Sequence, residues 1–360
     1  MDHFRIGVLT SGADCPGSNA VIRATVVSAL TLGWEVIGFI DGYEGLLFPK
    51  NYKPLTLENT EGITALGGTI LGTTSRGHFV VESVSGEKAQ IPQRIIDEAK
   101  KTVLDLGLQA LICIGGNKTL TAAEQLFENG VPVVGVPKTI DNDLSATAWT
   151  FGFDSAVHCV VDALDRLRTT AASHKRVMVL QVMGRDSGWI ALYGGFAGGA
   201  DVILIPEIPF SYKSLCAHVE KRMSGGEAST LIVVAEGAGP KGDEVLVVHG
   251  TTKVEVRSAG VGPRVAQEIM DRTGRETRTV VLGHLQRGGA PSMNDRILGI
   301  RFGVGAVQLI QEKKFGHMVS YLNYQTGVVT IKEAIDQVKY VPPDCQVVKT
   351  AKAVGISFGV

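Results

Sequence analysis

Short apolar runs alternate with amphipathic segments along most of the chain. The first apolar runs, each of which predicts a β-strand, are residues 4–10, 35–40, 109–114 and 131–137. The segments with helical periodicity between them are residues 19–33, 91–107 and 120–130. Because strands that alternate with helices form parallel sheets covered by helices on both faces, this part of the chain predicts a doubly wound α/β fold.

The alternation begins again after about residue 152. Residues 155–170 place five apolar side chains, among them Val160 and Leu164, at helical spacing on one face. The strand-like runs that follow are residues 176–184, 201–207 and 229–237. We therefore predict two α/β domains that change near residue 152, with ligand-binding loops at the carboxyl ends of the strands and a cleft between the domains.

Composition excludes several classes of protein. The 360 residues are 44% hydrophobic and 20% charged, which is typical of packed domains, and the net charge of -1 predicts no nucleic acid partner. Five scattered cysteines without a CxxC pair indicate a reducing compartment rather than a disulfide or zinc framework. No apolar run reaches about eighteen residues, and the N-terminus lacks a signal-peptide pattern. We expect a cytoplasmic protein that does not bind membranes.

Five polar or glycine-rich segments follow predicted strands. In chain order they are residues 10–19, 114–123, 137–144, 182–188 and 274–289. Loops at the carboxyl ends of strands are where α/β proteins place binding and catalysis. In the second segment a buried strand runs into Gly115 and Gly116, and Asn117 and Lys118 follow. Bare backbone N–H groups in such a turn hold phosphate, although an acid that binds Mg²⁺ is expected where this chain has the amide.

Two of these loops have a structural interpretation beside the chemical one. The turn at Gly12 leads to Pro16, which can open a helix whose N-terminus binds phosphate, or Asp14 can simply cap that helix. In the segment TIDND, Asp141 and Asp143 offer one carboxylate for a proton and one for a metal-bound water. The same segment can instead be a polar loop that folds on itself through side chain–backbone hydrogen bonds.

Cationic side chains gather in the later segments. They are Arg176, Arg185, Arg278, His284 and Arg287. Because guanidinium groups match phosphate oxygens bidentately, this set is suited to a phosphorylated ligand. Alternatively, Arg275, Glu276 and Arg278 form a solvated charge run, and His284 is a structural histidine. Lys138, directly before TIDND, suits either a phosphate–metal site or an ordinary salt bridge.

Together and in this order, these segments resemble the phosphofructokinase family with two Rossmann-like domains. The matching stretches are GVLTSGADCPGSNAVIR, DGYEGL, GGTILGTTSR, IGG at 114–116, PKTIDND, DRLR, SHKR, VMGRDSG, AEG and RETRTVVLGHLQRGG. Those around PKTIDND and GHLQRGG are highly specific. The resemblance implies an α/β fold of two three-layer α/β/α domains. Residues 1–152 with about 286–336 would bind the phosphoryl donor, and residues 153–285 with about 337–360 would bind the sugar phosphate.

The resemblance also implies roles on the acceptor side. Asp141 would be the base that deprotonates the 1-hydroxyl of fructose 6-phosphate, and Thr139 would hold that hydroxyl. Arg76 would reach the transferring phosphoryl group, where Lys138 would add a second cation. The residues that would line the sugar are Met183, Gly184, Arg185 and Glu236. Those that would hold its 6-phosphate are Arg176, Arg278, His284 and Arg287. Some of these come from a neighbouring subunit in the family, which implies a homo-oligomer, either a dimer or a tetramer, with shared active sites.

The donor side departs from the family pattern. Ala13 follows Gly12 where many members have a second glycine, and its methyl group takes room where the donor phosphates would approach the backbone. Asn117 follows Gly116 where many members have an acid that helps to bind Mg²⁺. Asp143 would therefore be the stronger of the two metal ligands.

Two lysines would lie near the donor phosphates. Lys118 is neither the small residue of ATP users nor the acid of most pyrophosphate users, whereas Lys138 occurs in pyrophosphate users and in some ATP users. The long side chain of Lys118 would crowd the α-phosphate and ribose of a nucleotide. We therefore predict a Mg²⁺-dependent 6-phosphofructokinase of glycolysis that uses pyrophosphate. The alternatives are an ATP-dependent 6-phosphofructokinase and a low-activity or regulatory paralogue that binds the sugar phosphate.

Overall fold

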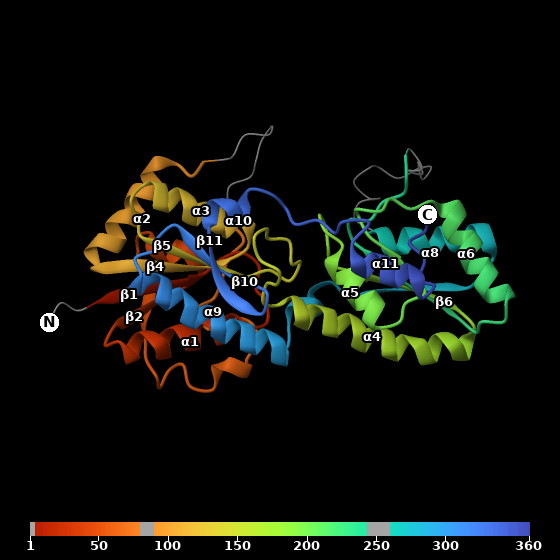
Figure 1. Cartoon of the computed structure of the whole chain (residues 1–360), viewed down its shortest axis with the longest axis horizontal. Coiled ribbons are helices and arrows are strands. Elements are labelled where there is room, and N and C mark those ends of the chain that lie inside the picture. Colours follow the sequence, from red (N-terminus) through yellow and green to blue (C-terminus); the bar gives the residue numbers. More distant parts are fainter. Residues whose placement is uncertain (1–3, 80–89, 243–259) are drawn as a thin grey trace. The chain divides into compact units, whose positions relative to one another are not determined.

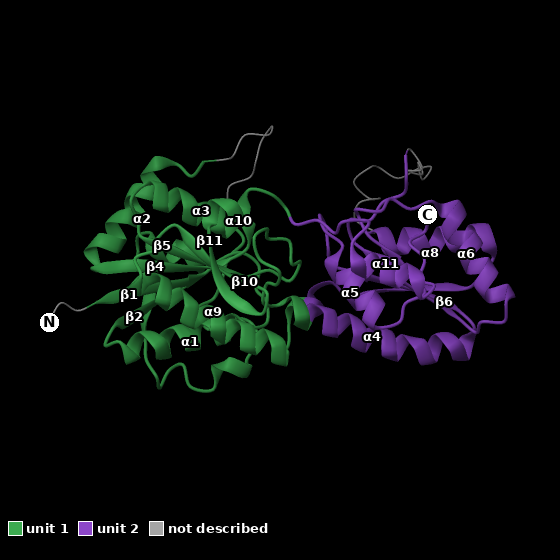
Figure 2. Cartoon of the chain, viewed as in Figure 1, with its two compact units in different colours: residues 1–155, 287–338 green, residues 156–286, 339–360 purple. Residues whose placement is uncertain are grey.

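The computed structural model describes residues 4–79, 90–242 and 260–360, which form two compact units (Figure 2). Unit 1 comprises residues 1–155 and 287–338, and unit 2 comprises residues 156–286 and 339–360. The boundaries predicted from the sequence lie near residues 152, 286 and 336. Each unit is therefore discontinuous in sequence, and each is completed by a segment from the C-terminal part of the chain.

A seven-stranded sheet forms the centre of unit 1 (Figure 1). Its strand order is β11-β10-β5-β4-β1-β2-β3, with the bounds β1 Arg5–Thr10, β2 Glu35–Phe39, β3 Tyr52–Leu55, β4 Leu108–Gly115, β5 Val133–Pro137, β10 His317–Leu322 and β11 Gln325–Thr330. The inner strands are parallel, as predicted, but β3 and β11 are antiparallel edge strands. The inner strands β1, β4 and β5 are nearly all buried, because apolar side chains cover both faces.

Helices cover both faces of this sheet, with α1 and α9 on one face and α2 and α3 on the other (Figure 1). The bounds are α1 Ser18–Thr31, α2 Gln93–Asp105, α3 Asn117–Glu128, α9 Met293–Gln311 and α10 Ile331–Ile335, with 3-10 turns η1 Gly42–Leu46 and η2 Ile63–Ala65. The expectation that Pro16 opens the first helix is wrong, because Gly17 takes a left-handed conformation with φ of 105° and α1 begins only after it. Gly17 thus separates Pro16 from the helix.

Unit 2 is built on a four-stranded parallel sheet with the order β7-β8-β6-β9. Its elements are α4 Phe153–His174, which begins in unit 1, β6 Val177–Val182, α5 Trp189–Ala197, β7 Val202–Leu204, α6 Tyr212–Ser224, β8 Thr230–Ala235, α8 Val261–Thr273, β9 Thr277–Val281, η3 Gly283–Arg287 and α11 Gln346–Ala353. Strands β6 and β8 are buried along their whole length, which explains their apolar runs. The two sheets with their helices confirm the predicted α/β class. None of the helices in the described ranges has the length and hydropathy of a membrane span.

A buried carboxylate fixes the segment through which the chain leaves unit 1. Asp295, near the beginning of α9, accepts hydrogen bonds on Oδ2 from the backbone N–H of Ser155 at 2.8 Å and from its hydroxyl at 2.5 Å. The Ser292 N–H donates to Ser155 Oγ at 2.9 Å, and the Ser292 hydroxyl donates to Asp154 at 2.5 Å. Burial raises the pKa of Asp295 to about 6, although the hydrogen bonds from Ser155 act in the opposite direction.

We expect Asp295 to make the protein less stable as the pH rises through the acid range. Its pKa of about 6 in the folded protein lies above the ordinary value of 3.8, so the carboxyl group favours folding while it is protonated. Relative to Asp295→Asn, which stays neutral, the wild type should lose about 3 kcal/mol of unfolding free energy between about pH 3 and pH 7. Urea unfolding of both proteins across this range measures the difference, and a difference that is constant with pH would contradict the expectation.

Candidate active site

Three neighbouring strands of unit 1 end at the same edge of the sheet. Because β1, β4 and β5 are adjacent and parallel, the loops that follow them lie side by side. The Ser11 N–H donates to Ile114 O at 3.1 Å, and the Lys138 N–H donates to Gly115 O at 2.9 Å. The segments brought together in this way carry Gly12, Ala13, Gly116, Asn117, Lys138, Thr139, Asp141 and Asp143.

Backbone contacts make this edge compact. Gly12 has a φ of 79°, and its N–H donates to Thr74 O at 3.0 Å. A Cβ atom at Gly116 would lie only 3.3 Å from Lys138 O, so the loops after β4 and β5 approach each other closely. Ala13, beside Gly12, is exposed. The edge therefore presents backbone and small side chains, as a phosphate-binding surface does.

The loop after β5 is organised by Asn142. This residue is buried with a φ of 51°, accepts the Thr150 N–H on Oδ1 at 3.1 Å and donates from Nδ2 to Ala148 O at 3.3 Å. Asp141 and Asp143 lie on either side of it and are half-buried, and the Asp141 N–H donates to Thr139 Oγ1 at 3.1 Å. The structural interpretation of TIDND therefore applies to Asn142, whose amide folds the loop, while the two carboxylates flank it.

Lys138 is a buried cation. The residue is 2% exposed, and its Nζ has no hydrogen-bond partner among the described residues. Burial lowers the pKa of the Lys138 ammonium to about 8, and the neighbouring Cys15 and Asp14 offset this only in part. Arg287 adds a second cation at this edge, since its Nη1 donates to Asp14 O at 3.4 Å. A bound anion would compensate the charge that these residues place here.

Helix α3 has Asn117 and Lys118 in its first turn. The sequence pattern predicts this helix from Leu120, but the helix begins at Asn117 and therefore includes Lys118, which is exposed. The N-terminal end of a helix is positive, so a lysine in the first turn is unfavourable unless an anion binds there. The first turn contains no acidic residue.

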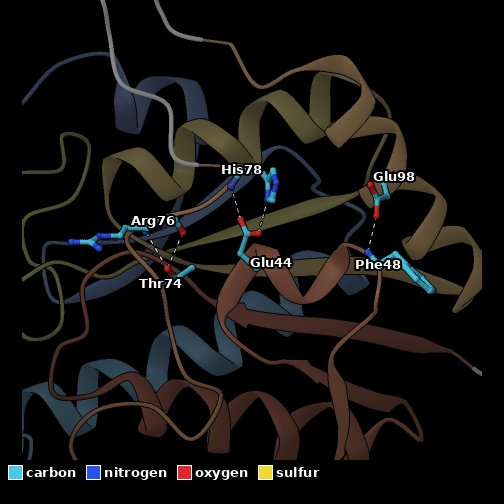
Figure 3. A network of polar contacts seen from close by, with 6 residues as sticks. All are labelled: Glu44, Phe48, Thr74, Arg76, His78 and Glu98. Carbon is cyan, nitrogen blue, oxygen red and sulfur yellow. Dashed lines mark hydrogen bonds and ion pairs between the residues drawn. The ribbon is translucent and has the colours of Figure 1, made fainter.

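Arg76 lies on an exposed turn that is attached to the same edge of unit 1. The Thr73 hydroxyl donates to Gly12 O at 2.6 Å, next to the contact between Gly12 and Thr74 described above. The guanidinium group of Arg76 extends away from Glu44 and His78 (Figure 3). The structure thus places Arg76 two residues beyond the contacts that attach its turn to the loop after β1.

The loops after β6 and β8 meet at the carboxyl edge of the sheet in unit 2. The Glu236 N–H donates to Val182 O at 2.9 Å, and the Gly237 N–H donates to Gly184 O at 3.0 Å. Gly184 has a φ of 127°, which few other residues adopt. The predicted sugar residues that these loops bring together are Met183, Gly184, Arg185 and Glu236.

Gln286 is a residue of this edge that the sequence analysis missed. It is buried, and its Oε1 accepts the Met183 N–H at 2.8 Å. It belongs to η3, which also carries the exposed His284 and follows β9, where the Leu282 N–H donates to Gln181 O at 3.0 Å. Gln286 therefore holds η3 against the end of β6, and its only sequence signal was its place in GHLQRGG.

Arg176 and Arg278 lie at the opposite end of the same sheet. Arg176 precedes β6 and Arg278 is the second residue of β9, so both are at the amino ends of strands. At about 3.3 Å per residue, β6 separates Arg176 from Met183 by about 23 Å. Glu276 pairs with both arginines, at 2.8 Å and 2.6 Å. Within one chain, the structure does not bring these two arginines together with the other sugar residues.

Several known proteins are similar to this chain in sequence or in fold. A family model described as Phosphofructokinase matches residues 5–310. The ATP-dependent 6-phosphofructokinase of Chloroflexus aggregans is 50% identical over 355 residues, which cover 99% of this chain and 98% of that protein. The pyrophosphate–fructose 6-phosphate 1-phosphotransferase of Amycolatopsis methanolica is 47% identical over 344 residues, which cover 95% and 97%. The structure of phosphofructokinase from Saccharomyces cerevisiae matches with a TM-score of 0.79 and 30% identity, over 92% of this chain and 45% of that chain.

Proposed function

Because the chain belongs to the phosphofructokinase family, we propose that it transfers a phosphoryl group to the 1-hydroxyl of fructose 6-phosphate. The observation that carries this proposal is the loop edge of unit 1. There Lys138, a buried ammonium without a hydrogen-bond partner among the described residues, directly precedes in sequence the loop with Asp141 and Asp143. A buried cation is suited to hold a phosphate, and a half-buried carboxylate on the loop that follows it is suited to accept a proton.

The reaction assigns one task to each of these side chains. Asp141 accepts the proton of the 1-hydroxyl as the hydroxyl oxygen forms its bond to phosphorus, and Thr139 holds that oxygen. The bond between phosphorus and the donor oxygen breaks, and the leaving phosphate keeps the electron pair. Arg76 stabilises the charge on the equatorial oxygens, and Lys138 that on the leaving phosphate.

We propose Mg²⁺ as the cofactor. Asp143 supplies a carboxylate oxygen and Asn117 an amide oxygen, and both are of the kind that Mg²⁺ prefers. Because only one of the two is an acid, the donor phosphates and water would complete the coordination of the ion. When bound, the ion neutralises charge on the donor phosphates.

We propose pyrophosphate as the donor. Lys138 in the edge of unit 1 and Lys118 in the first turn of α3 supply two cations, and pyrophosphate is small and densely charged. A nucleotide would gain the same attraction but would have to fit its α-phosphate and ribose past Lys118. ATP is the second candidate, because the Chloroflexus aggregans relative at 50% identity is ATP-dependent.

A donor panel tests the function directly. Purified protein is assayed for fructose 1,6-bisphosphate with fructose 6-phosphate, Mg²⁺ and either pyrophosphate, ATP or ADP. We expect turnover with pyrophosphate that exceeds turnover with ATP. Turnover with ATP alone would support the proposed reaction but exclude pyrophosphate as the donor. If no product forms with any donor, the chain would be a paralogue that only binds the sugar phosphate.

We also propose a homo-oligomer, either a dimer or a tetramer. Arg176 and Arg278 lie at the amino edge of the unit 2 sheet, far from Met183 in the same chain. In a second copy of the chain these arginines would complete the site that holds the 6-phosphate, which makes the active sites shared. Sedimentation of the protein and of Arg278→Glu, which reverses one of these charges, tests whether the edge participates in assembly.

Arg287→Ala is expected to weaken the use of fructose 6-phosphate. The change removes a charge-assisted hydrogen bond. The value of kcat/KM should therefore fall by an amount that corresponds to about 1.5–3 kcal/mol of lost binding free energy. Arg275→Ala is the matched control, because Arg275 is bound to Glu220 at 3.2 Å and has no proposed contact with the sugar. Equal effects of the two changes on kcat/KM, or equal use of fructose without its phosphate, would contradict the assignment.

A further inference from the structure

The turn that carries Arg76 is attached at both of its ends. Where this turn, residues 73–79, begins, the Thr73 hydroxyl donates to Gly12 O at 2.6 Å. Where it ends, the buried Phe79 ring stacks on Tyr43, with 4.9 Å between the ring centroids. The middle of the turn, residues 75–78, is exposed and is held by other contacts.

Two side chains hold this middle part (Figure 3). The Thr74 hydroxyl accepts the Arg76 N–H at 3.0 Å and donates to Arg76 O at 2.8 Å. Glu44, on η1, holds His78 with both carboxylate oxygens, since Oε1 accepts the backbone N–H at 2.7 Å and Oε2 lies 2.8 Å from the ring Nδ1. Gly77 permits this approach, because a Cβ atom there would collide with Glu44 Oε1, and its φ is 122°.

We propose that Glu44 is a positioning residue for Arg76. Glu44 acts through His78, whose backbone and ring it fixes two residues beyond Arg76, so that the turn has one conformation before the reaction begins. This role rests on the proposed function, in which Arg76 stabilises the transferring phosphoryl group. Charge stabilisation of this kind is effective only if the group is in place beforehand, and an error of about 1 Å can cost about a hundredfold in rate.

The contact between Glu44 and His78 lies outside the hydrophobic core. The two side chains are 26% and 55% exposed. Ion pairs and hydrogen bonds between groups as exposed as these contribute little to the stability of a fold. The loss of Glu44 should therefore appear in the rate of the reaction and in the mobility of the turn, rather than in the stability of the protein.

Glu98 provides a matched control in the same region (Figure 3). Its Oε1 accepts the Phe48 N–H at 2.6 Å, which is the same kind of bond, from a carboxylate to a backbone amide, that Glu44 makes with His78. Glu98 lies on α2 and holds the segment after η1, which carries no residue of the proposed site. Truncation of Glu98 therefore removes an equivalent bond without releasing the turn of Arg76.

Steady-state kinetics of Glu44→Ala, Glu44→Gln and Glu98→Ala test the proposal. We expect Glu44→Ala to lower kcat by about tenfold or more, with the KM for fructose 6-phosphate changed by less than about twofold. Glu44→Gln keeps an oxygen that can accept the His78 N–H, so it should recover most of the activity. Glu98→Ala should keep kcat within about twofold of the wild type.

A mutant cycle with Arg76 separates positioning from other effects. If Glu44 acts through Arg76, the change Glu44→Ala should have no further effect on kcat once Arg76→Ala is present. Amide hydrogen exchange supplies a readout that needs no turnover, since the His78 amide should exchange at least about tenfold faster in Glu44→Ala than in the wild type or in Glu98→Ala.

The outcomes distinguish this inference from the proposed function. An active wild type whose Glu44→Ala variant keeps full kcat overturns the role of Glu44 alone, and so does an unchanged exchange rate at His78. Additive losses in Glu44→Ala and Arg76→Ala would show that Glu44 acts by another route and would also overturn the proposal. A wild type without activity towards any donor would overturn the proposed function and this role with it.

Discussion

Replacement of Asp141 by serine is expected to lower the turnover number by about two to four orders of magnitude, because general base catalysis contributes an amount of this size. A serine hydroxyl cannot accept the proton of the sugar 1-hydroxyl at neutral pH. The loop should keep its shape, since Asn142 makes its hydrogen bonds to Thr150 and Ala148. The KM for fructose 6-phosphate should change little, because other residues hold the sugar phosphate.

The matched comparison is Asp143→Ser, the same exchange on the other side of Asn142. If Asp143 holds the metal, this variant should need more Mg²⁺ for activity, whereas Asp141→Ser should not recover at any Mg²⁺ concentration. Initial rates over a range of Mg²⁺ concentrations separate the two roles. Equal turnover of the wild type and Asp141→Ser would exclude Asp141 as the base.

Most strands of the two sheets could be predicted from the sequence, but β3, β10 and β11 could not. Strands β4 and β8 are buried on both faces and therefore appear as unbroken apolar runs. The edge strand β3 contains Pro54, which interrupts the hydrogen bonding of an inner strand but is tolerated at an edge. In β10 and β11 polar residues interrupt the apolar ones, and no residue of β11 is buried, so neither strand gave an apolar run that stood out.

The loops of the candidate site could be located from the sequence because they follow predictable strands. The sequence could not show which residues of such a loop make the hydrogen bonds that fold it. In TIDND, the amide of Asn142 makes the internal hydrogen bonds, while Asp141 and Asp143 flank it. The left-handed conformation of Asn142 depends on Thr150 and Ala148, which lie farther along the chain.

Other features depend on contacts between distant parts of the chain. Lysine is normally exposed, so nothing in PKTIDND indicates that Lys138 is buried against Cys15 and the loop after β1. The contact between Glu44 and His78 joins residues 34 positions apart. The division of the cationic set could have been expected from the sequence, because Arg176 precedes the strand that Met183 follows, and opposite ends of one strand cannot contribute to one site within a single chain.

Removal of both donor-side lysines is expected to reverse the donor preference. In the double variant Lys118→Gly with Lys138→Gly, kcat/KM for pyrophosphate should fall by about tenfold or more, since charge-assisted contacts are lost. Use of ATP should rise, because the room that Lys118 takes becomes free for the nucleotide. Lys213→Gly is the control, since Lys213 is also an exposed second residue of a helix, α6, but belongs to unit 2.

The variant Asn117→Asp introduces an acid as a metal ligand and tests whether a weak metal site limits the activity of the chain. It should lower the Mg²⁺ concentration needed for half-maximal rate, whichever donor is used, because a carboxylate binds Mg²⁺ more tightly than an amide. A wild type that uses ATP well and ignores pyrophosphate would show that Lys118 does not obstruct a nucleotide. If the wild type uses neither donor and Asn117→Asp gains activity, the weak metal site rather than the lysines limits the chain, which would then be a sugar-phosphate-binding paralogue with an incomplete donor site.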